Sequence, residues 1–250
     1  MSFYRYIHFL SLDVCVGALA YQAYFYKLQT GMLVPINLQI LLFCSIWVVY
    51  LLDRMIDVRI DLIRDERHQF IQQHQTKLLG LIGVLVLVIA NSLIRLPIEW
   101  ILKGTFIGLF LLFYWIAWAK KWFNRWVSKE FLTAFIYVLG IVFPFVNVHE
   151  VAIDCLLFLF FLIVLHHLKL FLHITGKKCS TFLLFVEVVM LGIFLYLYNY
   201  HNSIFLISYP LGITLGVQLI IHYFYPSVHQ RAIAEMAYWS PIILFVYELF

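Results

Sequence analysis

Apolar stretches of about 20 residues recur along this chain, and short polar segments separate them. A helix of that length crosses the hydrocarbon core of a bilayer. Of the 250 residues, 64% are hydrophobic and 12% are charged, which leaves too little polar surface to cover a water-soluble fold. The sequence therefore predicts an integral membrane protein, and it excludes a soluble domain, a disordered chain and a coiled coil.

The spacing of these stretches predicts an all-α, polytopic bundle of about nine transmembrane helices, in a single membrane domain over residues 1–250. The expected spans are 7–27, 33–52, 78–96, 99–119, 131–149, 151–173, 181–200, 203–225 and 232–250. The first follows Arg5, as the apolar part of a signal peptide would, but Asp13 interrupts it and no small-residue cleavage site follows. We therefore expect it to be retained as the first membrane helix.

The basic residues indicate which side of the bundle faces the cytoplasm, because Lys and Arg are enriched in cytoplasmic loops. With a cytoplasmic N-terminus, 14 of the 17 basic residues fall on the cytoplasmic side, and Lys27, Arg95 and Lys103 fall on the other. The 14 are Arg5, Arg54, Arg59, Arg64, Arg67, Lys77, Lys120, Lys121, Arg125, Lys129, Lys169, Lys177, Lys178 and Arg231. We expect an integral protein of the cell (inner) membrane, with the N-terminus cytoplasmic and the C-terminus on the opposite side.

Ionisable side chains inside the expected spans share one depth, toward the cytoplasmic end. They are Asp13, Glu130, His166, His167, Lys169, His173, Glu187 and Glu235. A charge in hydrocarbon costs several kcal/mol unless it is paired or hydrated, so such residues are functional candidates. They predict a polar chamber that opens to the cytoplasm. The alternative for Glu235 and His173 is an interfacial side chain that reaches water.

The richest polar segment follows the second expected span. Asp53, Asp57, Asp61 and Asp65 recur every four residues, which places them on one face of a helix. Oxygen ligands suit Mg²⁺, which keeps several waters and is usually completed by phosphate oxygens. Neighbouring arginines could instead neutralise the row on a solvated helix. Residues 62–77 could close over the chamber as a lid or form a helix on the membrane surface, and of these two we expect the surface helix.

The stretch D-R-M-I-D-V-R-I-D at residues 53–61 resembles the first signature of the UbiA superfamily of intramembrane prenyltransferases, N-D/Q-x-x-D-x-x-x-D. Asp57 and Asp61 match its second and third acidic positions, while Asp53 stands where the family has Asn and Arg54 where it has Asp or Gln. The resemblance implies a UbiA-like bundle and a Mg²⁺-dependent enzyme that moves an isoprenyl group from its diphosphate to a lipophilic acceptor. It also implies Asp53, Asp57 and Asp61 as magnesium ligands.

A second Asp-rich signature of that superfamily would fall near residues 166–181, where the sequence HHLKLFLHITGKKCST contains no acidic residue. Lysines in this segment could meet the diphosphate directly, as a charge clamp in place of a second ion. The residues expected to be catalytic are Asp57, Asp61 and Lys169, and those expected to bind substrate are Arg54, Lys177, Lys178, Glu187 and Asp13.

Other functions stay open. The missing second signature also fits a non-catalytic UbiA-like protein that binds a prenyl lipid or a partner protein. A haem held by histidines is a further hypothesis, and transport is another, although no inverted repeat is visible. The candidate haem ligands are His166, His167, His173 and His222, and the cysteines Cys15, Cys44, Cys155 and Cys179 are expected to be packed thiols. The expected partners are the isoprenyl diphosphate, its acceptor and membrane lipid, without nucleic acid.

Overall fold

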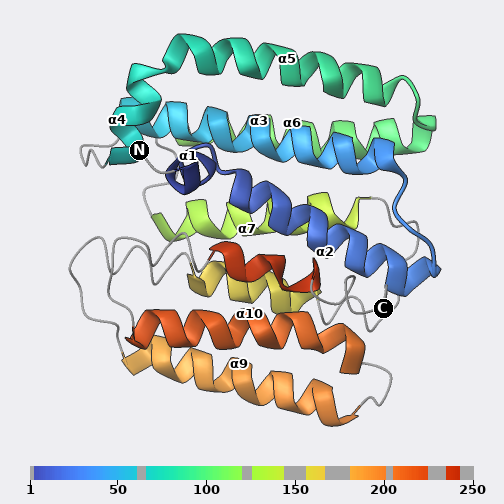
Figure 1. Ribbon diagram of the computed structural model, residues 1–250, viewed down its shortest axis with the longest axis vertical. Helices are drawn as coiled ribbons and strands as arrows, with labels where there is room; N and C mark the ends of the chain where they lie inside the picture. Colours follow the sequence, from blue (N-terminus) through green and yellow to red (C-terminus); the bar gives the residue numbers. More distant parts are fainter. Residues whose placement is uncertain are drawn as a thin grey trace.

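The computed structural model describes residues 3–60, 66–119, 126–143, 156–166, 181–200, 205–224 and 235–242. Within these ranges the chain forms helices joined by turns, and no β-strand occurs among them. The long helices lie side by side with their axes roughly aligned, from α5 (Gln75–Leu93) at one edge to α9 (Thr181–Tyr200) at the other (Figure 1). The all-α prediction is confirmed for this part of the chain.

The other helices overlap the expected spans with different bounds, except for the helix at residues 66–73, which lies between the second and the third span. They are α1 (Phe3–Phe9), α2 (Leu12–Thr30), α3 (Ile36–Ile60), α4 (Glu66–Gln73), α6 (Ile98–Ala119), α7 (Trp126–Val142) and α10 (Phe205–Phe224). Leu156–His166 is a further apolar helix, and residues 235–242 are helical around the 3₁₀ turn η1 (Ala237–Trp239). In the described part, three helices are long and apolar enough to cross a membrane: α3, α5 and α6. The count of nine spans and their orientation stay predictions.

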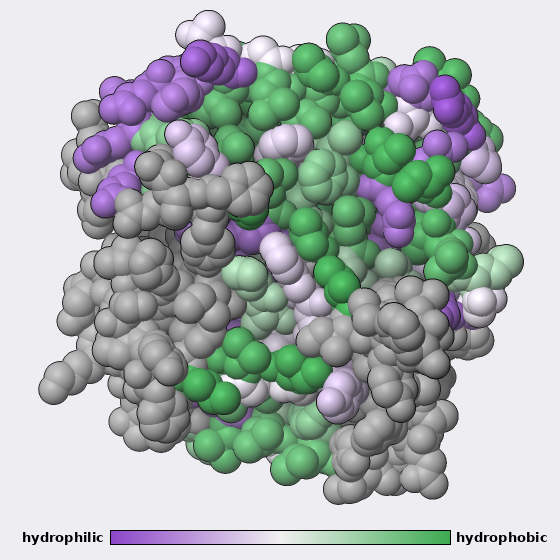
Figure 2. Space-filling model, viewed as in Figure 1, coloured by the Kyte–Doolittle hydropathy of each residue, from purple (hydrophilic) through white to green (hydrophobic). Residues whose placement is uncertain are grey.

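Large apolar side chains cover the outer faces of α5 and α6. Leu87 on α5 is 71% exposed and Phe106 on α6 is 70% exposed. Figure 2 shows a largely hydrophobic surface over α5, with hydrophilic surface at both of its ends. A bilayer solvates such a surface, whereas water does not, so these faces fit contact with lipid.

The first expected span, 7–27, is not one continuous helix, and this corrects the prediction. α1 ends at Phe9, α2 begins at Leu12, and Ser11 adopts the left-handed conformation with φ 56° and ψ 28°. Two hydrogen bonds satisfy the backbone at the break: the Ser11 N–H donates to the carbonyl of His8, and the Trp47 indole of α3 donates to the carbonyl of Leu10. The chain therefore changes direction just before Asp13.

The expected surface helix is α4, and its packing also differs from the prediction. Phe70 and Ile71 of α4 are buried, and the Phe70 ring lies 5.7 Å from the ring of Tyr6 and 5.5 Å from that of Phe9. These side chains join a hydrophobic cluster that also contains Leu51 of α3. Because its apolar face is covered by protein, α4 packs onto α1 and α3 and does not lie on lipid through that face.

Residues 235–242 are fixed against α10 and α2 by buried polar contacts. Thr214 Oγ1 lies 3.0 Å from both the Ala237 carbonyl and Ser240 Oγ, and it lies 2.9 Å from the hydroxyl of Tyr21. The amide of Gln218 donates to the hydroxyl of Tyr238 at 2.9 Å. Hydrogen bonds between helices hold packed segments together where water is scarce. The segment near the end of the chain is thereby held against its beginning.

A glycine permits the close approach of α2 to this segment. A Cβ atom at Gly17 would lie 2.9 Å from Tyr238 Cβ and 3.3 Å from the hydroxyl of Tyr137. Gly17 is one helical turn after Asp13, and Tyr238 is one turn after Glu235. The absence of a side chain at position 17 therefore lets the two acidic residues come together.

Gly17→Ala tests this close approach. Overpacking by a methyl group costs about 1–3 kcal/mol of the free energy of unfolding, which exceeds or offsets the gain in helix propensity of about 1 kcal/mol. Gly83→Ala on α5 is the matched control, because its Cβ would meet nothing within 4 Å. We expect a lower thermal denaturation midpoint in detergent for Gly17→Ala than for Gly83→Ala. Equal midpoints would contradict the packing of α2 on residues 235–242.

Candidate functional site

Asp53 and Asp57 lie within α3, one helical turn apart, and both are buried. Their exposed fractions are 9% and 3%, so the alternative of a solvated helix does not hold for these two residues. Asp53 Oδ1 accepts a hydrogen bond of 3.3 Å from the hydroxyl of Tyr114 on α6. Asp57 Oδ2 lies 3.6 Å from Nη1 of Arg54, an ion pair along the same helix. The predicted acidic face is thus turned into the protein.

A pocket between α3, α6 and α7 adjoins Asp53. Its wall includes Tyr50, Tyr114 and Tyr137, and its volume is about 40 Å³. That space is enough for a few water molecules. Apart from Asp53, Thr133 and the three tyrosines, the wall is formed by aliphatic side chains. The acidic residue therefore meets a small, mainly apolar and aromatic cavity.

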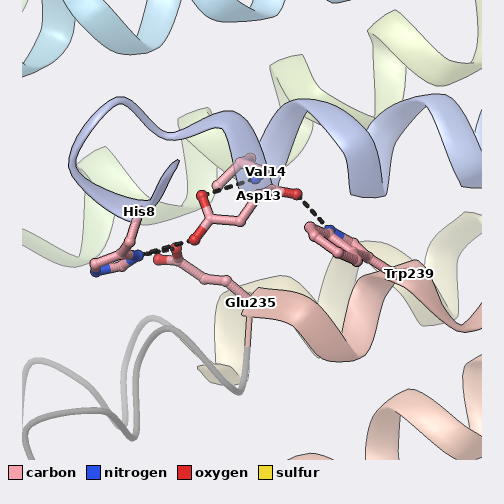
Figure 3. A network of polar contacts seen from close by, with 5 residues as sticks. All are labelled: His8, Asp13, Val14, Glu235 and Trp239. Carbon is pink, nitrogen blue, oxygen red and sulfur yellow. Dashed lines mark hydrogen bonds and ion pairs between the residues drawn. The ribbon is translucent and has the colours of Figure 1, made fainter. Parts of the chain in front are cut away.

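A second polar cluster joins the two ends of the described chain (Figure 3). His8 Nδ1 lies 2.8 Å from Asp13 Oδ2 and 3.2 Å from Glu235 Oε2. Asp13 is 1% exposed and Glu235 is 6% exposed. One imidazole nitrogen thus faces two carboxylates that the protein has removed from water.

The local structure accounts for this geometry. The break at Ser11 turns α1 so that His8 reaches back to Asp13, five residues later. The Val14 N–H donates to Asp13 Oδ1 at 3.0 Å and orients the carboxylate. The indole of Trp239 donates to the Asp13 carbonyl at 2.8 Å, which anchors the segment that carries Glu235 (Figure 3).

The positive charge of Arg54 acts on acidic residues of both clusters, the Asp53–Asp57 pair and Glu235. Its guanidinium interacts electrostatically with Asp57, Asp53 and Glu235. A further pocket is lined by Glu235 and His166, and it shares Tyr50 and Tyr137 with the pocket at Asp53. The described part of the chain therefore contains a polar region with two compartments, formed by α1, α2, α3, α6, α7, the helix Leu156–His166 and residues 235–242.

The remaining predicted site residues are distributed as follows. Glu187 is buried in α9, which packs on α10 and lies on the far side of α2 and α10 from α3 (Figure 1). Asp61, Lys169, Lys177 and Lys178 lie outside the described residues. Of the candidate haem ligands, His166 is buried at 1% exposure, and His167, His173 and the side chain of His222 lie outside the described part. Cys15 and Cys44 are free and buried, which confirms the prediction of packed thiols for these two.

The sequence did not predict His8 as a site residue, and it assigned no role to Tyr114. In the sequence, His8 is one residue at the start of an apolar span. It contacts Asp13, five residues later, only because the helix is broken between them. The alternative prediction for Glu235 is an interfacial side chain, but in the structure this residue is buried. The one available signal was Asp13, an acidic residue early in an apolar stretch that had no other explanation.

Trp239→Phe tests the anchor of the second cluster. The substitution keeps an aromatic ring but removes the hydrogen bond to the Asp13 carbonyl, so we expect it to lower the free energy of unfolding by about 0.5–1.5 kcal/mol. Trp115→Phe is the control, because the indole nitrogen of Trp115 makes no hydrogen bond within the described residues. Thermal denaturation in detergent measures both. An equal or larger loss for Trp115→Phe would contradict the proposed anchor.

Comparison with known proteins adds no relative from which a role could be transferred. No protein-family model, no curated protein and no solved structure matches this chain. The resemblance to the UbiA superfamily therefore stays a prediction that rests on residues 53–61.

Proposed function

We propose that this protein is a membrane prenyltransferase of UbiA type, which moves an isoprenyl group from its diphosphate to a lipophilic acceptor. The observation that carries the proposal is the pair of buried carboxylates, Asp53 and Asp57, one turn apart on α3 and next to Arg54. Buried charges are costly in a membrane protein and mark sites of function. This pair lies within the stretch that resembles the superfamily signature.

The donor set of this pair fits Mg²⁺. Asp53 and Asp57 offer only carboxylate oxygens, the ligands that this ion prefers, and Asp61 would add a third carboxylate from the sequence pattern. When bound, the ion would supply positive charge to neutralise the diphosphate leaving group. Arg54 has a fixed fork of donors that matches phosphate oxygens, and its Nε makes no hydrogen bond within the described part. Arg54 would therefore bind and orient the diphosphate.

The pocket at Asp53 suits the other half of the reaction. The bond between the isoprenyl carbon and the diphosphate oxygen breaks, and the carbon then bonds to the acceptor, which loses a proton. Aromatic faces stabilise the positive charge that develops on the isoprenyl group, and apolar walls keep water from it. Tyr50, Tyr114 and Tyr137 provide such faces. The pocket has a volume of about 40 Å³ and would therefore hold only part of the donor.

A second candidate function is a non-catalytic membrane protein that binds a prenyl lipid or a partner protein. Two observations favour it: the small volume of the pocket, and the absence of acidic residues from the sequence 166–181. This candidate predicts binding of an isoprenoid without release of diphosphate. The two functions therefore differ in a product that can be measured.

Asp57→Asn tests the proposed function. The purified full-length protein in detergent is titrated with geranyl diphosphate and with farnesyl diphosphate, in Mg²⁺ and in EDTA. We expect binding that requires Mg²⁺ in the wild type, and at least about tenfold weaker binding in Asp57→Asn, because a metal ligand is lost. Glu99→Gln, at an exposed position in the first turn of α6, should bind as the wild type does.

Two outcomes separate the candidates. Release of diphosphate in the presence of lipophilic acceptors supports the transferase, and binding without release supports the non-catalytic protein. If the wild type and Asp57→Asn bind the diphosphates equally with and without Mg²⁺, then the metal-dependent site does not exist.

A further inference from the structure

We propose that His8, Asp13 and Glu235 form a binding site for a divalent transition-metal cation, distinct from the Asp53–Asp57 pair. Each residue offers one ligand atom, and the three atoms lie within 4.8 Å of one another. They come from α1, from the first turn of α2 and from the segment 235–242, so tertiary packing and not sequence proximity brings them together. Figure 3 shows the three side chains pointing toward a common centre.

The distances from His8 Nδ1 fit ligation, and the ligand atoms of the two carboxylates lie within 4.8 Å of each other. Ligands about 2.0–2.2 Å from a metal, at tetrahedral to octahedral angles, lie roughly 2.8–3.6 Å from one another. His8 Nδ1 is 2.8 Å from Asp13 Oδ2 and 3.2 Å from Glu235 Oε2. A cation could therefore replace the proton between these atoms with little movement of the side chains.

The charges favour a cation at this position. His8 Nδ1 carries at most one proton, yet it faces two carboxylates that are 1% and 6% exposed. Two carboxylates that share a site out of water repel each other unless positive charge lies between them. A divalent ion supplies twice the charge of a proton and bonds to both carboxylates as well as to the imidazole.

The surroundings of the ligands resemble those of a metal site. Metal-bound carboxylates are usually held by a further hydrogen bond, and Asp13 Oδ1 accepts one from the Val14 N–H. The adjoining pocket is lined by Glu235, His166 and Tyr238, and its volume of about 20 Å³ admits one water molecule. Water at this position would complete the coordination of an ion that has three protein ligands.

The donor set identifies the class of cation. One imidazole nitrogen with two carboxylate oxygens suits Zn²⁺, Mn²⁺ or Fe²⁺, because nitrogen ligands favour transition metals over Mg²⁺. The oxygen-only pair on α3 has the opposite preference. The two sites therefore differ in the ion that they select.

The test uses the full-length, tag-free protein in detergent, stripped with EDTA and then titrated with Zn²⁺ by calorimetry. We expect one equivalent of Zn²⁺ in the wild type, and at least about tenfold weaker binding in His8→Gln and in Glu235→Gln. The control variant Glu99→Gln, at an exposed position, should bind Zn²⁺ as the wild type does. Asp57→Asn removes no ligand of this site but changes the ion pair of Arg54, so it should weaken Zn²⁺ binding less than His8→Gln and Glu235→Gln do. Glu235→Gln should in turn keep any Mg²⁺-dependent binding of the diphosphates.

A measurement on the wild type keeps the proposal testable if these variants fail to fold. Co²⁺ replaces Zn²⁺ as a spectroscopic probe, and its absorption spectrum should indicate nitrogen and oxygen ligands without sulfur. Zn²⁺ should also raise the thermal denaturation midpoint, because it binds the folded state. The proposal is overturned if the wild type binds no Zn²⁺ or Co²⁺, or if His8→Gln and Glu235→Gln fold and bind Zn²⁺ as tightly as the wild type.

Discussion

The contact between the first turn of α2 and residues 235–240 is the constraint on which the polar region depends. Trp239 donates to the carbonyl of Asp13 across 226 residues of sequence, and Gly17 leaves room for Tyr238 at the interface. Without this contact, Asp13 and Glu235 would be two separate acidic residues in apolar segments. Because the two carboxylates lie close together and out of water, they repel each other, and positive charge between them reduces this repulsion.

The same principle explains why α3 carries its charges inward. Its neighbour α5 presents Leu87 to the surroundings, so a charged face on α3 has no solvent on that side. Asp53 and Asp57 instead turn toward Tyr114 and Arg54. In a bilayer, polar side chains gather where protein can solvate them, and this produces one compact polar region within an apolar bundle.

The positions of the helices follow from the sequence because the bilayer fixes the length of an apolar stretch, and this requirement is local. The pairing of Asp53 with Asp57 is also local, since residues four apart share a face of a helix. The role of His8 could not be predicted, because Leu10, Ser11 and Leu12 continue the apolar pattern without a proline or a glycine to indicate a break. Likewise, the partner of Asp13 depends on the packing of a distant segment, which no spacing in the sequence encodes.

Tyr50 and Tyr137 stand between two compartments of different chemistry. Each ring forms part of the wall of the pocket at Asp53 and also of the pocket at Glu235 and His166. A substitution at either tyrosine would therefore change the walls of both pockets at once, so a defect there would affect the α3 acids and the His8–Asp13–Glu235 cluster together.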